Sequence, residues 1–378
     1  MRIALDGMLL GRRFTGVEGA ITELARTLSV SGTHDYRLYT GADAATVAPA
    51  GGRLRVIRRR WPARFRPIRI LWEQLALPRL LAADRCELLH APAYVAPLMA
   101  RVPVVLTLYD LIAFSHGDYC TQSNRLHFRL LVPPSVRKAA VVVVPSRAVR
   151  DDLIRLMPGA AGKIRVIPLG LREEFRPVQD PSAFERLRRT YGIAGPFILF
   201  VGRTEPKKNL VRLIEAFRLL RQRTVLRHQL VIAGAPSWDE ANVVAAVRKH
   251  GLNEVVVRTG FVPAGDLPAL YSLADLFVFP SLCEGFGLPP LEAMACGTPA
   301  MVSDRGALRE VAGGAAVLTD PLAPDRMARD LEAVLTDPLP RDPRIAEGLR
   351  HARTFTWART AAATEAAYAD AVNGGRRP

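Results

Sequence analysis

Short apolar runs alternate with segments of helical periodicity along most of this chain. The runs have the length of buried strands and occupy residues 2–5, 36–40, 54–57, 86–90, 103–108, 139–144, 196–201, 229–233, 255–259 and 276–279. Helical spacing of apolar residues follows several of them, at 21–28, 70–81 and 210–217. Strands that alternate with helices predict an α/β fold whose parallel sheets are doubly wound, in the Rossmann manner.

The length of the chain predicts two such domains. At 378 residues it exceeds what one hydrophobic core usually supports, and its 49% content of hydrophobic residues can fill two cores. No apolar run approaches the roughly 18 residues that span a bilayer. Asp6 interrupts the apolar N-terminus, unlike in a signal peptide. We therefore expect a cytoplasmic protein.

The cysteines give no sign of a metal or disulfide framework. They are Cys86, Cys120, Cys283 and Cys296, which lie far apart, form no CxxC pair and have no histidines nearby at ligand spacing. We expect free thiols, packed as small apolar side chains, and no metal site.

The formal net charge of +16 is concentrated in residues 53–69, which contain eight arginines, no acidic residue and the aromatic residues Trp61 and Phe65. A nucleic-acid-binding fold signature is missing around this stretch, so we expect no nucleic-acid partner. Basic and aromatic side chains together favour peripheral contact with an anionic membrane surface, such as the inner face of the cytoplasmic membrane. An ordinary basic loop explains the stretch equally well.

The most informative stretch is 278–303, VFPSLCEGFGLPPLEAMACGTPAMVS. A buried strand leads into a Gly-Phe-Gly loop, and two prolines mark the start of a helix. The free N–H groups at such a helix start suit a phosphate. Glu284 and Glu292 flank the loop, and carboxylates suit sugar hydroxyls because they only accept hydrogen bonds. The stretch predicts a nucleotide-sugar site, and the alternative is a pair of solvated helix charges.

A second stretch places cations at the end of another strand. Residues 202–209, GRTEPKKN, follow the apolar run 196–201 and precede a helix. Cations are poorly placed there to complement the helix dipole. We therefore expect Arg203 and Lys208 to face an anion, and Lys207 to be a solvated neighbour.

These two stretches resemble the retaining glycosyltransferases of family 4, which have the two-domain GT-B fold. The match includes the E-x7-E spacing of Glu284 and Glu292, and LWEQLALPRLL, ELLHAPAYVAPL and VPVVLTLYDL resemble bacterial mannosyltransferase-like members. The resemblance implies an acceptor-binding domain at 1–177 and a donor-binding domain at 178–354, with chemistry in the cleft between them. It also implies that a C-terminal helix at about 355–372 packs back on the first domain.

The resemblance also implies roles for individual residues. Arg203 and Lys208 would hold the donor's diphosphate, Glu292 the ribose hydroxyls, and Glu284 the transferred sugar. The sugar and diphosphate would also be held by backbone groups of Gly285, Phe286, Gly287 and Leu288. The nucleotide base would pack near Val262, although core packing explains this residue equally well.

Two candidate sites in the first domain carry alternatives. Gly16 lies in a glycine-containing loop that would face the donor or acceptor, or that only needs a turn. Tyr109 and Asp110 stand where the family commonly has a His-Asp pair. Tyr109 can donate a hydrogen bond but cannot take up a proton near neutral pH. Asp110 is either an acceptor-side catalytic group or a polar cap for the loop after it.

The function implied is retaining transfer of a hexose from a nucleotide sugar to a glycan or a polyprenyl- or lipid-linked acceptor, as in cell-surface polysaccharide or lipopolysaccharide biosynthesis. Residues 205–209 look most like members that use GDP-mannose, and UDP-linked donors remain an alternative. Fixed cations would stabilise the diphosphate leaving group, so we expect no metal or other cofactor. A nucleotide-sugar epimerase and a non-catalytic basic binder are the alternatives.

Overall fold

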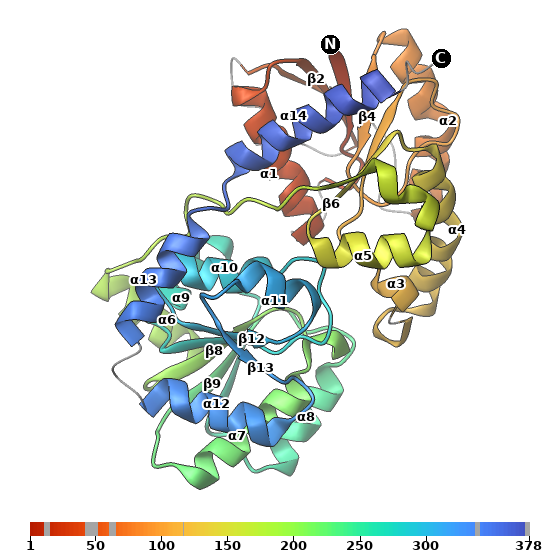
Figure 1. The fold of residues 1–378 in the computed structure, drawn as a ribbon. Helices are drawn as coiled ribbons and strands as arrows, with labels where there is room; N and C mark the ends of the chain where they lie inside the picture. Colours follow the sequence, from red (N-terminus) through yellow and green to blue (C-terminus); the bar gives the residue numbers. More distant parts are fainter. Residues whose placement is uncertain (11–15, 42–51, 60–65, 116, 337–340, 375–378) are drawn as a thin grey trace. The chain divides into compact units, whose positions relative to one another are not determined.

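The computed structural model describes residues 1–10, 16–41, 52–59, 66–115, 117–336 and 341–374. The chain forms two compact units (Figure 1). Unit 1 comprises Met1–Gly170 and Phe355–Pro378, and unit 2 comprises Leu171–Thr354. Residue 177, where the sequence placed a domain boundary, lies near the start of unit 2.

Unit 1 is built on a parallel sheet. Its described residues form seven strands in the order β3-β2-β1-β4-β5-β6-β7. The elements are β1 (Arg2–Asp6), α1 (Gly16–Ser31), β2 (Asp35–Thr40), β3 (Leu54–Arg58), α2 (Arg66–Ala83), β4 (Leu88–Ala91), β5 (Val104–Thr107), α3 (Ile112–Ser115), η1 (Gly117–Tyr119), α4 (Gln122–Lys138), β6 (Val141–Val144), α5 (Arg147–Leu156), η2 (Pro158–Lys163), β7 (Ile164–Val166) and α14 (Trp357–Gly374).

Unit 2 repeats this plan with a six-stranded parallel sheet among its described residues, in the order β10-β9-β8-β11-β12-β13. The elements are α6 (Pro181–Tyr191), β8 (Phe197–Val201), η3 (Pro206–Lys208), α7 (Leu210–Arg223), β9 (Gln229–Ala233), α8 (Glu240–Lys249), β10 (Val256–Gly260), η4 (Ala264–Asp266), α9 (Leu267–Leu273), β11 (Leu276–Phe279), α10 (Leu288–Ala295), β12 (Ala300–Ser303), α11 (Gly306–Ala312), β13 (Val317–Thr319), α12 (Pro324–Thr336) and α13 (Arg341–Ala352). The predicted α/β class with parallel sheets is confirmed.

Both faces of the unit 1 sheet are buried, which explains its continuous apolar strands. In β6, Val141 and Val143 pack in one core with α1 and α14. Val142 and Val144 point the other way, into a second core with α2, α4 and α5. Figure 1 shows α14 lying beside α1, so the C-terminal helix covers the sheet of unit 1.

The basic stretch 53–69 is only partly a surface feature. Its first residues form the edge strand β3, its last residues begin α2, and Trp61 and Phe65 lie outside the described residues. Arg69 is buried and ion-paired with Glu73, so at this position the expectation of an exposed basic group is wrong. Within the described ranges, no helix is both long enough and apolar enough to cross a bilayer.

One buried polar network ties α14 to the sheet. The Nδ1 atom of His90, in β4, lies 2.8 Å from the Tyr368 hydroxyl of α14, and its Nε2 atom lies 2.8 Å from the Thr107 hydroxyl of β5. Burial lowers the pKa of His90 to about 3. The imidazole is therefore neutral, with each ring nitrogen matched to one hydroxyl.

Replacing Tyr368 by Phe should lower the unfolding free energy of unit 1 by about 1–3 kcal/mol, because it leaves a buried ring nitrogen of His90 without a partner. Urea unfolding followed by tryptophan fluorescence measures this. The matched control is Tyr191→Phe in unit 2, whose hydroxyl lies 3.5 Å from Asp266. A loss no larger than that of the control would contradict the role of Tyr368.

Candidate active site

The strand order of unit 2 reverses between β8 and β11. From β8 the chain builds outward through β9 to β10, and from β11 it builds outward in the other direction through β12 to β13. At such a reversal the loops after the two strands diverge, and the carboxyl edge of the sheet opens into a crevice. Residues 202–209 follow β8 and residues 280–287 follow β11, so the two predicted stretches meet at this point.

Two lysines and one glutamate form the charged centre of this edge. The Nζ atom of Lys208 lies 2.6 Å from Oε1 of Glu284, and that of Lys207 lies 3.6 Å from Oε2. The Lys207 side chain is only 17% exposed. The prediction that Lys207 is a solvated neighbour is therefore wrong, because it is the second cation on the same carboxylate.

The charge balance of this centre keeps Glu284 ionised. Burial alone would raise the pKa of the Glu284 carboxyl, but the charges of Lys208 and Lys207 outweigh it and hold the pKa below its usual value. Lys208 also lies 4.5 Å from the ring centre of Phe279, at the end of β11. The cluster carries two positive charges against one negative charge, which leaves it attractive to an anion.

Asn209 holds the lysine loop in place, and the sequence analysis did not identify it. Its backbone has φ of 62°, a left-handed conformation that asparagine tolerates. Its buried Nδ2 atom donates to the carbonyl oxygens of Pro280 and Pro321, at 3.1 and 2.7 Å. It thereby ties together the loops after β8, β11 and β13. The only available signal was its position directly before the helix.

The Gly-Phe-Gly loop makes the sharp turn into α10. Gly287 is the N-cap residue with φ of 103°, and a Cβ atom there would lie 2.5 Å from Leu308. Phe286 is buried, and its side chain belongs to the core. Pro289 and Pro290 have no N–H group, so amide donors at this helix start come mainly from Gly285 to Leu288.

Glu292 lies in α10 and is paired with Tyr271 of α9. The Tyr271 hydroxyl donates to Oε2 of Glu292 at 2.9 Å. Burial raises the pKa of Glu292 to about 6, and the Tyr271 hydrogen bond opposes this shift. The Tyr271 ring is fully buried and packs edge-on against Phe175 and Phe277. Tyr271 was not predicted, because in the sequence it is indistinguishable from any core aromatic residue.

Two other predicted donor residues lie apart from these contacts. The Arg203 side chain is 57% exposed, lies 3.7 Å from Glu205 and donates to the Ser237 hydroxyl at 3.1 Å. Among the described residues, no contact joins it to Lys208 or Glu292. Val262 is buried, whereas its neighbour Phe261 is 67% exposed. Of this pair, Phe261 is the side chain accessible to a ligand.

Among the predicted residues of unit 1, Asp110 takes part in two hydrogen bonds within the unit. Asp110 accepts hydrogen bonds from the Ile112 amide at 3.2 Å and from the Tyr94 hydroxyl at 3.0 Å. The first of these bonds holds the backbone at the start of α3. Burial raises the pKa of Tyr109, which keeps its hydroxyl protonated. Gly16 is the first residue of α1, and a Cβ atom there would meet nothing within 4 Å.

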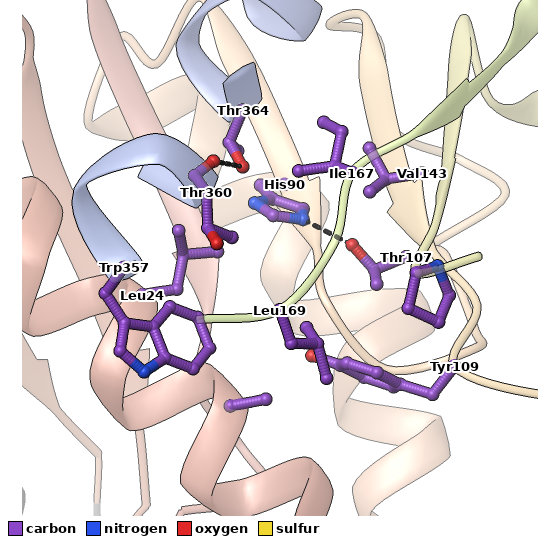
Figure 2. A pocket seen from close by; sticks show the side chains of 12 residues that line it. Leu24, His90, Thr107, Tyr109, Val143, Ile167, Leu169, Trp357, Thr360 and Thr364 are labelled. Carbon is purple, nitrogen blue, oxygen red and sulfur yellow. Dashed lines mark hydrogen bonds between the residues drawn. The ribbon is translucent and has the colours of Figure 1, made fainter. Parts of the chain in front are cut away.

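Tyr109 also lines a small cavity in unit 1. Figure 2 shows it beside Leu169, across from Trp357 and Leu24, with the His90–Thr107 hydrogen bond at the back. The centre of a water molecule can occupy about 20 Å³ of this cavity. The lining is mostly apolar. Over the part of the chain that the structure describes, no group of three His, Cys, Asp or Glu residues could hold a metal ion.

Comparison with known proteins assigns both units. The family described as "Glycosyl transferases group 1" matches residues 184–351, and "Glycosyltransferase Family 4" matches residues 14–175. The chain is 29% identical over 372 residues to O-antigen chain mannosyltransferase B of Escherichia coli, covering 94% of this chain and 96% of that protein. It is 31% identical over 284 residues to D-inositol 3-phosphate glycosyltransferase of Corynebacterium glutamicum, covering 72% of this chain and 68% of that protein.

A third relative is longer than this chain. The serotype-specific mannosyltransferase WbdA of Escherichia coli is 32% identical over 280 residues, which cover 72% of this chain and 34% of WbdA. The match thus spans about one third of that relative.

Solved structures share the fold over nearly the whole length. HepE of Anabaena in complex with UDP and glucose superposes with a TM-score of 0.76 at 22% identity, covering 98% of this chain and 99% of that one. WaaG, a glycosyltransferase involved in lipopolysaccharide biosynthesis, gives 0.74 at 17% identity, covering 97% and 98%. The two parallel-sheet units are therefore those of the GT-B fold, and the chain belongs to glycosyltransferase family 4.

Proposed function

We propose that this glycosyltransferase moves mannose from GDP-mannose, with retention, onto a glycan or a polyprenyl- or lipid-linked acceptor in cell-surface polysaccharide or lipopolysaccharide biosynthesis. The observation that carries the nucleotide-sugar part is the pair of lysines on Glu284 beside the glycine loop. The choice of mannose is supported by the name of the Escherichia coli relative that matches this chain end to end.

The proposed reaction uses the unit 2 site to stabilise the leaving group. The acceptor oxygen forms a bond with the anomeric carbon while the bond from that carbon to the diphosphate oxygen breaks. The electron pair leaves with the nucleoside diphosphate, which takes up the acceptor proton on the same face. Lys207, Lys208 and the amides of the loop 285–288 face the growing negative charge. An ammonium group has three donors, so Lys208 can serve Glu284 and a phosphate oxygen together.

Glu284 and Glu292 then bind hydroxyl groups. Glu284 stays ionised beside its lysines and accepts from the transferred sugar. Glu292 has one oxygen occupied by Tyr271 and offers the other to the ribose. In this scheme the lysines take the place of a metal ion, so turnover needs no divalent cation.

The donor is tested by incubating the protein with GDP-mannose, UDP-glucose, UDP-N-acetylglucosamine and dTDP-rhamnose, each with and without octyl α-mannoside in EDTA. We expect transfer from GDP-mannose only, undiminished by EDTA. Isomerised sugar nucleotide formed without acceptor would instead indicate an epimerase. Loss of turnover in EDTA that Mg²⁺ or Mn²⁺ restores would contradict metal-free catalysis.

The substitution Lys208→Met tests the leaving-group role of this lysine in the same assay. Removing one leaving-group cation should lower kcat about 100-fold or more. Lys249→Met, at an exposed position at the end of α8, is the control and should retain wild-type kcat.

The pH dependence of donor binding tests the Tyr271–Glu292 pair. The ribose hydroxyls donate to the carboxylate, so binding needs the ionised form. Donor KM should therefore rise as the pH falls through about 6, the pKa of Glu292. Tyr271→Phe removes a hydrogen bond that lowers this pKa, which should move the midpoint upward and raise donor KM at neutral pH about tenfold.

Tyr191→Phe serves as the control, with an unchanged midpoint. A Tyr271→Phe enzyme with the wild-type pH profile would show that this hydroxyl does not act on Glu292.

We also propose that the protein is cytoplasmic and meets the inner face of the cytoplasmic membrane through residues 53–69, apart from the buried Arg69, and through exposed side chains of α2. Arg58 and Arg59 are exposed, as are the apolar side chains of Leu71 and Leu75, at 55% and 43%. A combination of exposed basic and exposed apolar side chains suits an anionic interface. A lipid-linked acceptor would be presented there.

Pelleting with phosphatidylglycerol vesicles measures this contact. Replacing Arg58 and Arg59 by Gln should reduce partition roughly 30-fold, at about 1 kcal/mol for each basic group. The control pair, Arg227 and Arg248 of unit 2, is also exposed and should have little effect. Equal losses in both variants would point to non-specific charge attraction.

A further inference from the structure

A second, smaller polar cavity lies in unit 1. Its lining consists of Asp6, Leu9, Arg69, Glu73, Ala93 and Val95. The centre of a water molecule can occupy about 10 Å³ of this cavity, which is close to the volume needed to hold one water molecule or one hydroxyl oxygen. Neither the charged cluster of unit 2 nor the cavity beside Tyr109 shares a charged residue with it.

The position of this cavity in the fold is that of a ligand site. The strand order of unit 1 reverses between β1 and β4, because the chain builds outward from β1 to β3 on one side and from β4 to β7 on the other. Asp6 is the last residue of β1, and Ala93 and Val95 follow β4. The cavity therefore lies at the carboxyl-edge reversal of this sheet, the same place that the lysine cluster occupies in unit 2.

The charged side chains of this cavity are buried, but some of their hydrogen-bonding atoms have no partner among the described residues. Asp6, Arg69 and Glu73 are 8%, 8% and 6% exposed. The Nε atom of Arg69 lies 3.1 Å from Oε1 of Glu73, without hydrogen-bond geometry, and it remains a buried donor with no acceptor. No ion pair or hydrogen bond joins the two Nη groups of Arg69 to another described residue.

Each of the two carboxyl groups also has one oxygen atom that accepts no hydrogen bond from a described residue. Asp6 accepts from the Met8 amide at 3.1 Å through Oδ1, and no described residue donates to its Oδ2. Glu73 has no described partner at Oε2. Burial raises the pKa of both carboxyl groups, and the charge of Asp6 raises that of Glu73 further. The Nε atom of Arg69 is buried without an acceptor, which is costly, so the arrangement favours a bound polar group.

We propose that this cavity is an acceptor subsite that receives one hydroxyl group of the acceptor sugar. The Arg69 guanidinium can only donate hydrogen bonds, and an ionised carboxylate can only accept them. A hydroxyl group matches both, because it accepts from the guanidinium and donates to the carboxylate. A phosphate only accepts and would meet two carboxyl groups, and an apolar group would leave the Nε atom of Arg69 without an acceptor. The inference rests on the proposed function and names the group that unit 1 recognises.

The test couples substitutions to acceptor analogues. The enzyme is assayed with GDP-mannose, using octyl α-mannoside and its monodeoxy analogues as acceptors. In the wild type, loss of one particular hydroxyl should lower kcat/KM at least about tenfold. Glu73→Gln should lower kcat/KM for the parent acceptor by a similar factor and lower it little further for that one analogue, because the two changes remove the same interaction.

Glu365→Gln is the control, since this carboxylate binds Tyr36 and Thr33 in the same unit. Its effect should be the same for every analogue. Additive losses for Glu73→Gln with all analogues would overturn the proposal and leave the cavity with a structural water only. If Glu73→Gln does not fold, Asp6→Asn takes its place. A wild type with no sensitive hydroxyl overturns the proposal without any variant.

The two failures are distinguishable. No transfer from GDP-mannose to octyl α-mannoside by the wild type rejects the proposed function, and this inference with it. Transfer that shows no coupling between Glu73 and a hydroxyl rejects only the subsite.

Discussion

The reversal of strand order in each parallel sheet is the constraint on which this structure depends. A doubly wound sheet grows outward in two directions from its centre, so loops part at the carboxyl edge only where the direction changes. In unit 1 that point lies between β1 and β4, and in unit 2 between β8 and β11. Charged clusters of the described residues lie at both points.

The strands could be predicted from sequence because burial on both faces makes them continuously apolar. Val141 to Val144 is such a strand. The helix positions from Ile21 to Leu28 could be predicted as well, because their apolar residues recur with helical periodicity. Contacts between segments that are distant in the sequence cannot be predicted from local periodicity. Lys208 and Glu284 are 76 residues apart and are joined only because β8 and β11 are neighbours. The error over Lys207 has the same origin, since an adjacent lysine looks solvated until its acidic partner is known.

Composition was a weaker guide than position. Counting arginines in 53–69 gave a basic surface, but the count cannot tell which side chain turns inward. Arg69 lies one helical turn before Glu73 on the face of α2 that also carries Trp72 toward the core. A long arginine stem can be buried there only because a carboxylate accompanies it. Tyr271 escaped notice for the opposite reason, since its hydroxyl, and not its apolar ring, defines its role.

The two clusters differ in charge balance, and this difference supports the proposed division of substrates. In unit 2, Lys207 and Lys208 outnumber Glu284, which supports the proposed binding of a diphosphate and the proposed stabilisation of the charge that grows as it leaves. In unit 1, Arg69 lies with Asp6 and Glu73, whose raised pKa values leave the cluster without an excess of positive charge, whereas hydroxyl groups can accept from Arg69 and donate to a carboxylate. In this proposal, two parallel sheets with the same reversal of strand order hold different substrates, because the charge balance differs between their openings.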